Sequence, residues 1–235
     1  MMSDPALFRP LTPGTQPPAD HPDYRSTAKR HPKAPLVPLP ATLTEATGPV
    51  FTPEHFPPLA DLTRVNGKPA LGERIIVTGR VMDEDGRPLR RTMVEIWQAN
   101  AAGRYDHPND QHDAPLDPNF HGEGRVFTDD EGMYRFLTIR PGSYPWRNHP
   151  NAWRPNHIHF SLFGEAFAQR LITQMYFPGD PLLALDPIYN AIPDAAARER
   201  LIAKFDITVT EPEWALGYRF DIVLRGRLAT PFENA

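Results

Sequence analysis

The chain has 235 residues, of which 40% are hydrophobic, and its formal net charge is −4. This length is enough to bury one sizeable core, and the mild charge balance gives no electrostatic reason to bind nucleic acid or a membrane surface. The absence of cysteine excludes disulfides, zinc–thiolate sites, iron–sulfur clusters and cysteine nucleophiles. Because no stretch resembles a signal peptide or a membrane span, we expect a cytoplasmic protein without membrane association.

Residues 1–71 form an arm that is dense in proline. The chain contains 29 prolines against 15 glycines. Proline disfavours helix interiors and central strands, so we expect this arm to be extended and irregular. It still carries apolar side chains, Tyr24 among them, which a disordered tail would mostly lack. We therefore expect the arm to wrap over its own core or over a partner chain.

Residues 72–235 have the pattern of a β domain. The segments "RIIVTGRVMDEDGRPLRRTMVEIWQA" and "RVFTDDEGMYRFLTI" each place two β-rich runs around an acidic turn that ends in glycine, at 83–86 and 129–132. Further strands are predicted in "HIHFSLF", "RLITQMYF", "FDITVT" and "YRFDIVLRG". Only residues 194–205 have the spacing of a short helix. The pattern predicts an all-β fold, an antiparallel β-sandwich, with the arm and the sandwich forming one structural domain.

Three polar segments interrupt the strands, at residues 100–124, 140–156 and 177–193. Long loops on a rigid sandwich are the usual place for a functional site. We therefore expect the site-bearing residues in and beside these loops.

The motif "RPNHIHF" places His157 and His159 two positions apart in a predicted strand. Residues i and i+2 of a strand point to one face, so both imidazoles could bind one metal ion. The alternative interpretation is a pair of core histidines with ordinary hydrogen-bond partners. The same spacing occurs in the cupins, which usually add a carboxylate a few residues further on, and the match here is poor.

Tyrosines in the flanking loops could complete a metal site. Tyr144 lies between proline and tryptophan in "PGSYPW", and Tyr105 follows the "MVEIWQA" strand. A phenol has a pKa of about 10, so a metal that binds it must be a strong Lewis acid. Ferric iron is hard and prefers anionic oxygen, which favours Fe(III) over softer divalent ions. Alternatively, both tyrosines pack against Trp97 and Trp146.

The order and context of these motifs resemble the intradiol ring-cleaving dioxygenases. The resemblance rests on "VEIWQANAAGRYDH", "PGSYPW" and "WRPNHIHF" and extends over most of the chain. It implies one mononuclear Fe(III) per chain and insertion of both atoms of O2 between the two hydroxyl-bearing carbons of a catechol. Ser143 departs from the pattern, since the family more often has proline there. This departure leaves the neighbouring tyrosine in place.

By this resemblance, Tyr105 and His157 are the equatorial protein ligands of the iron, and Tyr144 and His159 are the axial ones. Solvent fills the fifth position. Tyr144 is also expected to act in catalysis, by leaving the iron and taking a proton from the substrate.

The resemblance also assigns residues around the iron. Arg154, three residues before His157, matches the family's active-site arginine and is expected to stabilise negative charge on the substrate ring; a salt bridge at the strand edge is the alternative. The expected pocket residues are Tyr24, Trp97, Trp146, Gln174 and Ile188.

The branch of the family that the chain resembles implies a substrate and a partner chain. The match is closest to β chains that work with a homologous α chain in αβ units, which assemble further. The proline-rich arm stands where catechol 1,2-dioxygenases have a helical dimerisation segment. This favours protocatechuate, which carries a carboxylate, with 3-carboxy-cis,cis-muconate as product. Two alternatives remain: an intradiol enzyme for catechol, hydroxyquinol or a sulfonated catechol, and a non-catalytic sandwich subunit.

Overall fold

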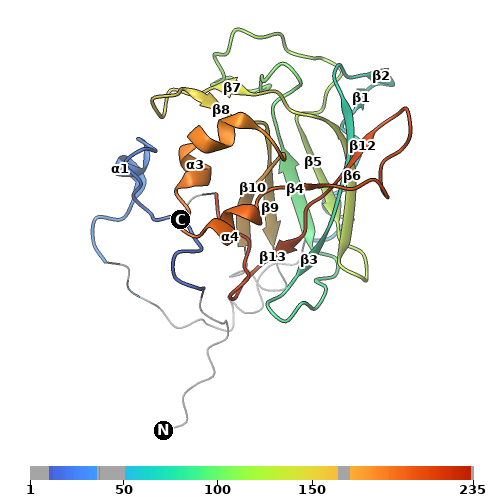
Figure 1. The fold of residues 1–235 in the computed structure, drawn as a ribbon. Helices are drawn as coiled ribbons and strands as arrows, with labels where there is room; N and C mark the ends of the chain where they lie inside the picture. Colours follow the sequence, from blue (N-terminus) through green and yellow to red (C-terminus); the bar gives the residue numbers. More distant parts are fainter. Residues whose placement is uncertain (1–10, 36, 38–50, 164–169, 234–235) are drawn as a thin grey trace.

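The computed structural model describes residues 11–35, 37, 51–163 and 170–233, and its strands form two main sheets (Figure 1). The first contains, in spatial order, β10 (Arg170–Tyr176), β9 (His157–Phe163), β4 (Met93–Trp97) and β5 (Glu123–Phe127). The second contains β11 (Lys204–Phe205), β12 (Leu216–Arg219), β3 (Arg74–Met82) and β13 (Ile222–Val223), and β6 (Met133–Ile139) pairs with β3. Two small hairpins stand apart, β1 (Arg64–Val65) with β2 (Lys68–Pro69) and β7 (Tyr144–Pro145) with β8 (Trp153–Arg154). The predicted β-sandwich is confirmed.

One hydrophobic core contains side chains from both sheets. Val77 and Phe136 of the second sheet share it with Ile158 and Phe160 of the first, and each is at most 1% exposed. The rings of Phe136 and Phe160 lie 6.0 Å apart between centroids. Burial of one such side chain stabilises the fold by about 1.5–3 kcal/mol. The core therefore fixes β9, with its two histidines, as a rigid central element.

Both predicted acidic turns are confirmed. Asp83 accepts hydrogen bonds from the backbone N–H groups of Asp85 and Arg87, and Gly86 has φ +78°. Asp129 repeats this arrangement at the start of the second turn. Such turns typically contain an aspartate whose carboxylate accepts from the backbone N–H two residues later. A glycine with a left-handed backbone conformation then follows.

Most strand pairs are antiparallel, as predicted, but two are not. β12 and β13 both run parallel to β3. The predicted strand "FDITVT" is strand only at Phe205, because the Asp206 side chain accepts from the Thr208 N–H and hydroxyl and turns the chain.

The predicted helix over residues 194–205 is too long. The structure has α4 (Ala195–Glu199), capped by the Asp194 side chain, which accepts from the Ala197 N–H. Beyond it, the backbone of Leu201 and Ala203 pairs with both backbone groups of Tyr176 at the end of β10. Pairing with a strand edge replaces the remaining helical hydrogen bonds.

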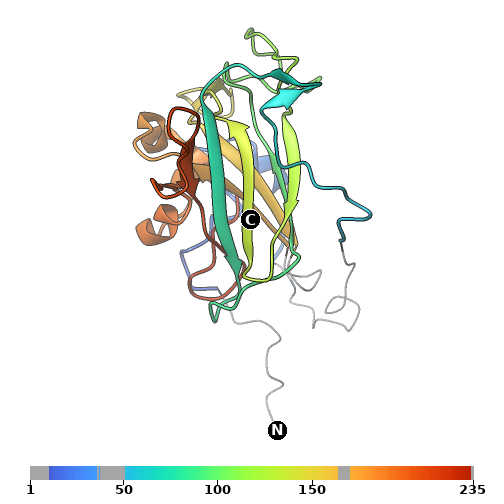
Figure 2. The same ribbon diagram turned by 90° about the vertical axis from the view of Figure 1, so that its right-hand side faces the viewer.

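The described residues contain three further short helical segments: α1 (Thr27–Arg30), η2 (Pro181–Leu185) and α3 (Pro187–Asn190). η2 and α3 each begin with an Asp-Pro pair, in which the aspartate caps and the proline opens the helix. This start signal was readable in the sequence. Figure 2 shows α3 and α4 gathered at one side of the sheets. No helix within the described ranges is long and apolar enough to span a bilayer.

The described part of the arm packs on its own chain. Tyr24 is buried and contacts the ring of Trp146, with 5.0 Å between centroids. The backbone N–H groups of Arg25 and Ser26 donate to Asn148. Residues 1–10, 36 and 38–50 of the predicted arm lie outside the described residues. The arm thus reaches the 140–156 loop, which was predicted to carry the site.

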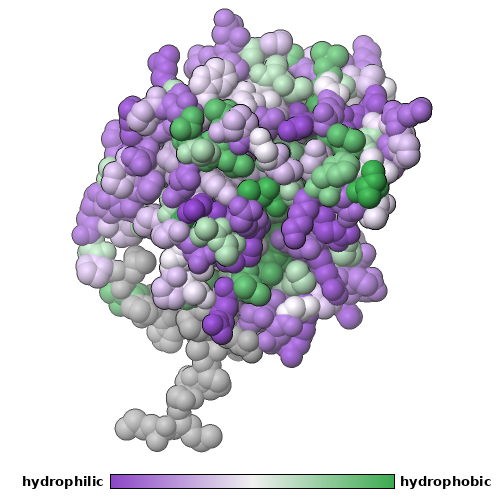
Figure 3. Space-filling model, viewed as in Figure 1, coloured by the Kyte–Doolittle hydropathy of each residue, from purple (hydrophilic) through white to green (hydrophobic). Residues whose placement is uncertain are grey.

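The surface combines polar residues with a few exposed apolar side chains. On the face shown in Figure 3, hydrophobic residues appear over the segment 205–216, where Phe205, Ile207 and Leu216 are exposed.

Candidate active site

The two histidines of β9 project to one face of the first sheet, as predicted, while Ile158 enters the core on the other face. Their ring centroids lie 4.9 Å apart. The Nδ1 atom of His157 lies 2.6 Å from the Pro155 carbonyl oxygen, and that of His159 lies 2.8 Å from Glu233 Oε2. With Nδ1 occupied in both rings, Nε2 is the nitrogen that each ring can offer to a common ligand, and Nε2 of His157 lies 3.3 Å from the Tyr144 hydroxyl.

The two predicted tyrosines lie beside these histidines. The Tyr144 ring is 5.3 Å from that of Tyr105 and 5.4 Å from that of His157, between centroids. The Tyr105 ring is 6.3 Å from that of His159. Four rings from two loops and one strand therefore converge on one place, which no local sequence pattern could show by itself.

The loops meet because of a glycine. A Cβ atom at Gly103 would lie 2.0 Å from the Ser143 carbonyl oxygen, and Gly103 has φ +77°. Only glycine permits this backbone conformation at so close an approach. The contact sets Tyr105 against Tyr144. The Tyr105 N–H donates to Asp110 Oδ2 at 2.7 Å, which fixes the start of the Tyr105 loop.

Burial favours the neutral forms of Tyr105, Tyr144 and His157. Burial, and then the neighbouring Tyr144, raise the pKa of Tyr105 well above its usual value. Burial also raises the pKa of Tyr144, although the positive charge of Arg154 opposes the shift. Burial, followed by the nearby Arg154 and His159, lowers the pKa of His157 well below its usual value. His157 therefore presents a neutral imidazole, while the phenols lose their protons only to a strong Lewis acid.

This arrangement fits a metal ion. The Tyr105 hydroxyl is buried and has no hydrogen-bond partner in the described structure, which is a costly state for a polar group. Among the residues the structure describes, no three His, Asp or Glu side chains form a cluster that could hold a metal. A metal at this place must therefore use the phenol oxygens together with the imidazoles. That donor set suits a hard, highly charged cation.

Arg154 lies against this cluster in a buried polar network. It is 2% exposed, and its Nη2 lies 3.0 Å from Oδ2 of Asp186, which is fully buried. Nη2 also donates to Gln174 Oε1 at 2.5 Å, and Nη1 donates to the Tyr144 hydroxyl at 3.4 Å. Burial opposes the charge of Arg154, but Asp186 and the adjacent phenols hold its pKa above the usual value. The site thus contains a permanent positive charge beside Tyr144.

Comparison with known proteins identifies the family. A dioxygenase family model matches residues 46–226, and a model of the N-terminal part of the protocatechuate 3,4-dioxygenase beta subunit matches residues 9–42. The chain belongs to the intradiol ring-cleaving dioxygenase family. It is 62% identical over 237 aligned residues to the protocatechuate 3,4-dioxygenase beta chain of Burkholderia cepacia, covering 99% of this chain and 100% of that one.

Two further relatives define the range of the similarity. The protocatechuate 3,4-dioxygenase alpha chain of Pseudomonas putida is 34% identical, over 69% of this chain and 77% of that one. Among solved structures, the dioxygenase domain of a carbohydrate-binding fusion protein from Streptomyces sp. SirexAA-E is similar, with a TM-score of 0.52 and 28% identity. That match covers 76% of this chain and 94% of the other.

The other residues predicted from the resemblance lie around the candidate site in two groups. Trp97 and Trp146 line a cavity of about 680 Å³ together with Tyr105, Tyr144 and His159. Trp97 also stacks on the His159 ring at 4.8 Å between centroids.

The second group lies deeper or to one side. Gln174 is buried in the Arg154 network. Tyr24 and Ile188 line a separate small cavity of about 40 Å³. Tyr24 contacts Trp146, which lines the main cavity.

Three residues of the candidate site were not predicted from the sequence: Tyr176, Asp186 and Glu233. Tyr176 stands opposite His157 in the β9–β10 register, so its place follows once that pairing is known. Asp186 precedes Pro187, a pattern typical of a helix cap, and it does cap α3. It is also the ion-pair partner of Arg154. Glu233 is 74 positions from His159, and no local signal connects them.

Proposed function

We propose that the chain is the iron-bearing subunit of a protocatechuate 3,4-dioxygenase. It inserts both atoms of O2 into 3,4-dihydroxybenzoate between the hydroxylated carbons and gives 3-carboxy-cis,cis-muconate. The observation that carries this proposal is the convergence of Tyr105, Tyr144, His157 and His159 around a buried phenol without a partner. The 62% identity to a chain of that name over the full length supports the substrate.

These four side chains would hold one ferric ion per chain. When bound, the ion would supply a Lewis acid that favours loss of the catechol protons and makes the ring reactive toward O2. The imidazoles supply neutral nitrogen, and the phenols supply anionic oxygen, which together stabilise the ferric state. The Trp97 ring and Glu233 fix the orientation of His159.

Tyr144 is suited to move a proton. Its hydroxyl lies 3.3 Å from His157 Nε2 and 3.4 Å from Arg154 Nη1. Burial favours the phenol form, whereas the Arg154 charge favours the phenolate. The Tyr144 oxygen can therefore bind the metal as a phenolate, and a phenolate free of the metal can accept a proton from a catechol hydroxyl.

Arg154 supplies fixed positive charge. It remains protonated throughout, because Asp186 and the phenols stabilise its charge in a buried setting. The guanidinium is therefore unsuited to proton transfer and suited to stabilising negative charge on the substrate ring.

A guanidinium at the cavity favours a carboxylated substrate. Arg147 lines the cavity together with His107, Asp110 and His112. Its positive charge would stabilise the carboxylate of protocatechuate, a group that catechol and hydroxyquinol lack. A sulfonated catechol would also be attracted, so charge alone does not distinguish it.

A homologous α chain is the proposed partner, in αβ units that oligomerise in the cytoplasm. Relatives named as alpha chains resemble this chain at 34% and 30% identity. The exposed Phe205, Ile207 and Leu216 supply apolar surface suited to such a contact.

The test combines colour, iron content and oxygen uptake. The protein is purified with its partner chain, and its iron content and visible spectrum are measured before and after anaerobic addition of protocatechuate. We expect one iron per site, a broad phenolate-to-iron band that shifts with substrate, and uptake of one O2 per protocatechuate. An iron-loaded protein without the band would exclude the tyrosine ligands. Faster turnover of catechol than of protocatechuate would exclude the proposed substrate.

A further inference from the structure

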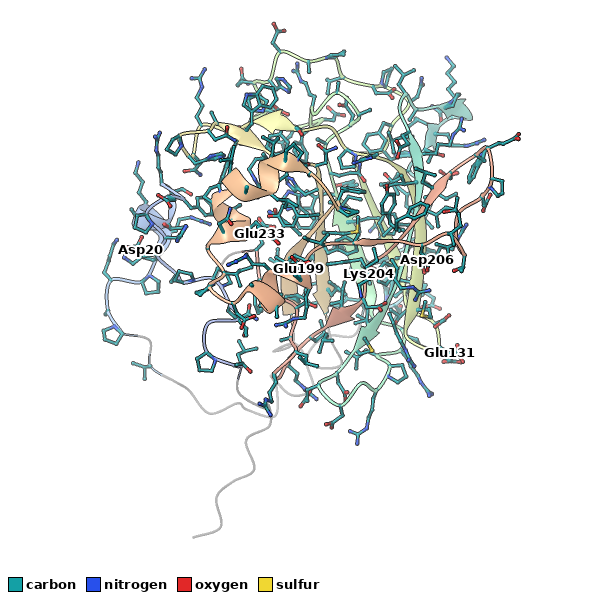
Figure 4. The ribbon with its side chains drawn as sticks, viewed as in Figure 1. Asp20, Glu131, Glu199, Lys204, Asp206 and Glu233 are labelled. Carbon is teal, nitrogen blue, oxygen red and sulfur yellow. The ribbon has the colours of Figure 1, made fainter. Side chains whose placement is uncertain are left out.

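The segment 230–233 ends beside the proposed metal centre. The Thr230 N–H donates to the Val223 carbonyl, and the Pro231 carbonyl accepts from the Thr173 hydroxyl at 2.7 Å. The Glu233 N–H donates to the Ile172 carbonyl at 2.9 Å. These bonds hold the segment between β13 and β10 and direct Glu233 toward β9. In the view of Figure 4, Glu233 lies between α3 and α4.

The carboxylate of Glu233 contacts one of the proposed ligands directly. Its Oε2 lies 2.8 Å from His159 Nδ1, and the two side chains are 16% and 10% exposed. The two imidazoles of the centre therefore differ. His157 is held by a neutral carbonyl oxygen, that of Pro155, whereas His159 is held by a carboxylate.

A carboxylate on the far nitrogen of a histidine ligand has two effects. It fixes the tautomer and the orientation of the ring, and it makes the coordinating nitrogen more basic. The other contacts of His159 in the site are with rings: Trp97 at 4.8 Å, His157 at 4.9 Å and Tyr105 at 6.3 Å between centroids. The stack on Trp97 fixes the ring plane, but it does not distinguish the two nitrogens.

We infer that Glu233 is a positioning residue of the metal centre. It holds the His159 proton on Nδ1 and leaves Nε2 free to coordinate the metal. The segment 230–233 is thereby part of the iron site. This inference rests on the proposed function, because it assumes a metal bound by His159.

The N-terminal arm secures the same segment. Gln16 Oε1 accepts from the Phe232 N–H at 2.8 Å, next to Glu233. The arm is itself held two residues before Gln16, where the Gly14 carbonyl accepts from the Asp194 N–H at the start of α4. Loss of the Gln16 side-chain bond should loosen Glu233 without removing its charge.

The experiment compares Glu233→Gln, Glu233→Ala and Gln16→Ala with the parent in the iron-loaded protein. Glu131→Gln is the matched control, because Glu131 is exposed in the turn before β6 and lies far from Glu233 in Figure 4. The readouts are the half-time of iron loss to excess EDTA and the position of the visible band. Thermal unfolding of the metal-free proteins reports on folding alone.

We expect Glu233→Ala to lose iron about 10- to 100-fold faster than the parent, with a shifted band. Glu233→Gln should lose iron at an intermediate rate, because its amide oxygen can still accept from Nδ1–H. Gln16→Ala should show a smaller change in the same direction, and Glu131→Gln none. The metal-free variants should all remain folded at the temperature of the iron-loss assay, although Glu233→Ala should unfold at a lower temperature than the parent because it loses the bond to His159.

Two results would overturn the inference in different ways. If the parent shows the iron band and both Glu233 variants keep iron and band unchanged, Glu233 has no role at the metal. If the iron-loaded parent itself shows no band, the proposed tyrosine–histidine centre fails, and the role of Glu233 fails with it.

Discussion

The buried ion pair between Arg154 and Asp186 gives the most direct test of how the site is built. The substitution Asp186→Asn preserves the shape of the side chain and removes its charge. Its Oδ1 can still accept from the Ile188 N–H, which keeps the cap of α3. What is lost is the charge that faces Arg154 Nη2 at 3.0 Å, together with the oxygen that accepts from the Tyr176 hydroxyl at 3.0 Å.

The expected cost follows from burial. Removing one partner of a buried ion pair leaves an uncompensated charge and costs about 3–5 kcal/mol of unfolding free energy. Arg154 retains hydrogen bonds to Gln174, Tyr176 and Tyr144, so we expect the lower end, about 3 kcal/mol. For a chain of this size, each kcal/mol lowers Tm by about 2–4 °C, which gives a drop of about 6–12 °C.

The assay is urea and thermal unfolding of the metal-free protein, with Asp194→Asn as control. Asp194 caps α4 as Asp186 caps α3, but it is half-buried and its carboxylate does not face Arg154. Its substitution should cost at most about 1 kcal/mol. Equal stability of Asp186→Asn and Asp194→Asn would refute the argument, because the buried pair would then contribute nothing beyond a helix cap.

The remaining predictions concern catalysis and pH. Arg154→Leu should keep iron and colour but lower kcat by about 10²–10³-fold, and an unchanged kcat would contradict its electrostatic role. Tyr144→His should retain iron, since imidazole can still coordinate, yet slow the binding of protocatechuate in stopped-flow absorbance; binding as fast as in the parent would exclude Tyr144 as the leaving ligand. Tyr134, whose hydroxyl donates to the Phe220 carbonyl, has a pKa raised well above 10 by burial, so the folded chain keeps a proton that the unfolded chain loses. The free energy of unfolding of the parent should therefore fall above pH 10. Tyr134→Phe should be about 1 kcal/mol less stable than the parent at pH 8, and this difference should shrink by up to about 1.4 kcal/mol per pH unit above pH 10. A gap that stays constant in alkaline urea titrations would contradict this.

Local patterns predicted what depends on neighbours in the sequence. The projection of His157 and His159 to one face follows from the period of a strand, and the two acidic turns follow from their own residues. The spacing at 194–205 was compatible with a helix. The structure prefers a strand edge there, because Tyr176 offers free backbone groups.

Features that depend on distant partners could not be predicted in this way. The parallel pairing of β12 and β13 with β3 leaves no local signature. Asp186 has an adequate local role as a cap, which conceals its ion pair with Arg154. Glu233 reaches His159 only because the sandwich brings two remote segments together.

The different supports of the two tyrosines give a structural reason for the proposal that Tyr144, rather than Tyr105, is the ligand that leaves. Tyr105 is fixed by its N–H bond to Asp110 and by the close approach of Gly103, and its hydroxyl is buried without another partner. Tyr144 lies on β7, a strand of only two residues paired with β8, and its hydroxyl already has Arg154 as an alternative partner. A phenol released from the metal would remain hydrogen-bonded at Tyr144 but would be unsatisfied at Tyr105. Since an unsatisfied buried hydroxyl costs about 1–3 kcal/mol, release of Tyr144 is favoured over release of Tyr105.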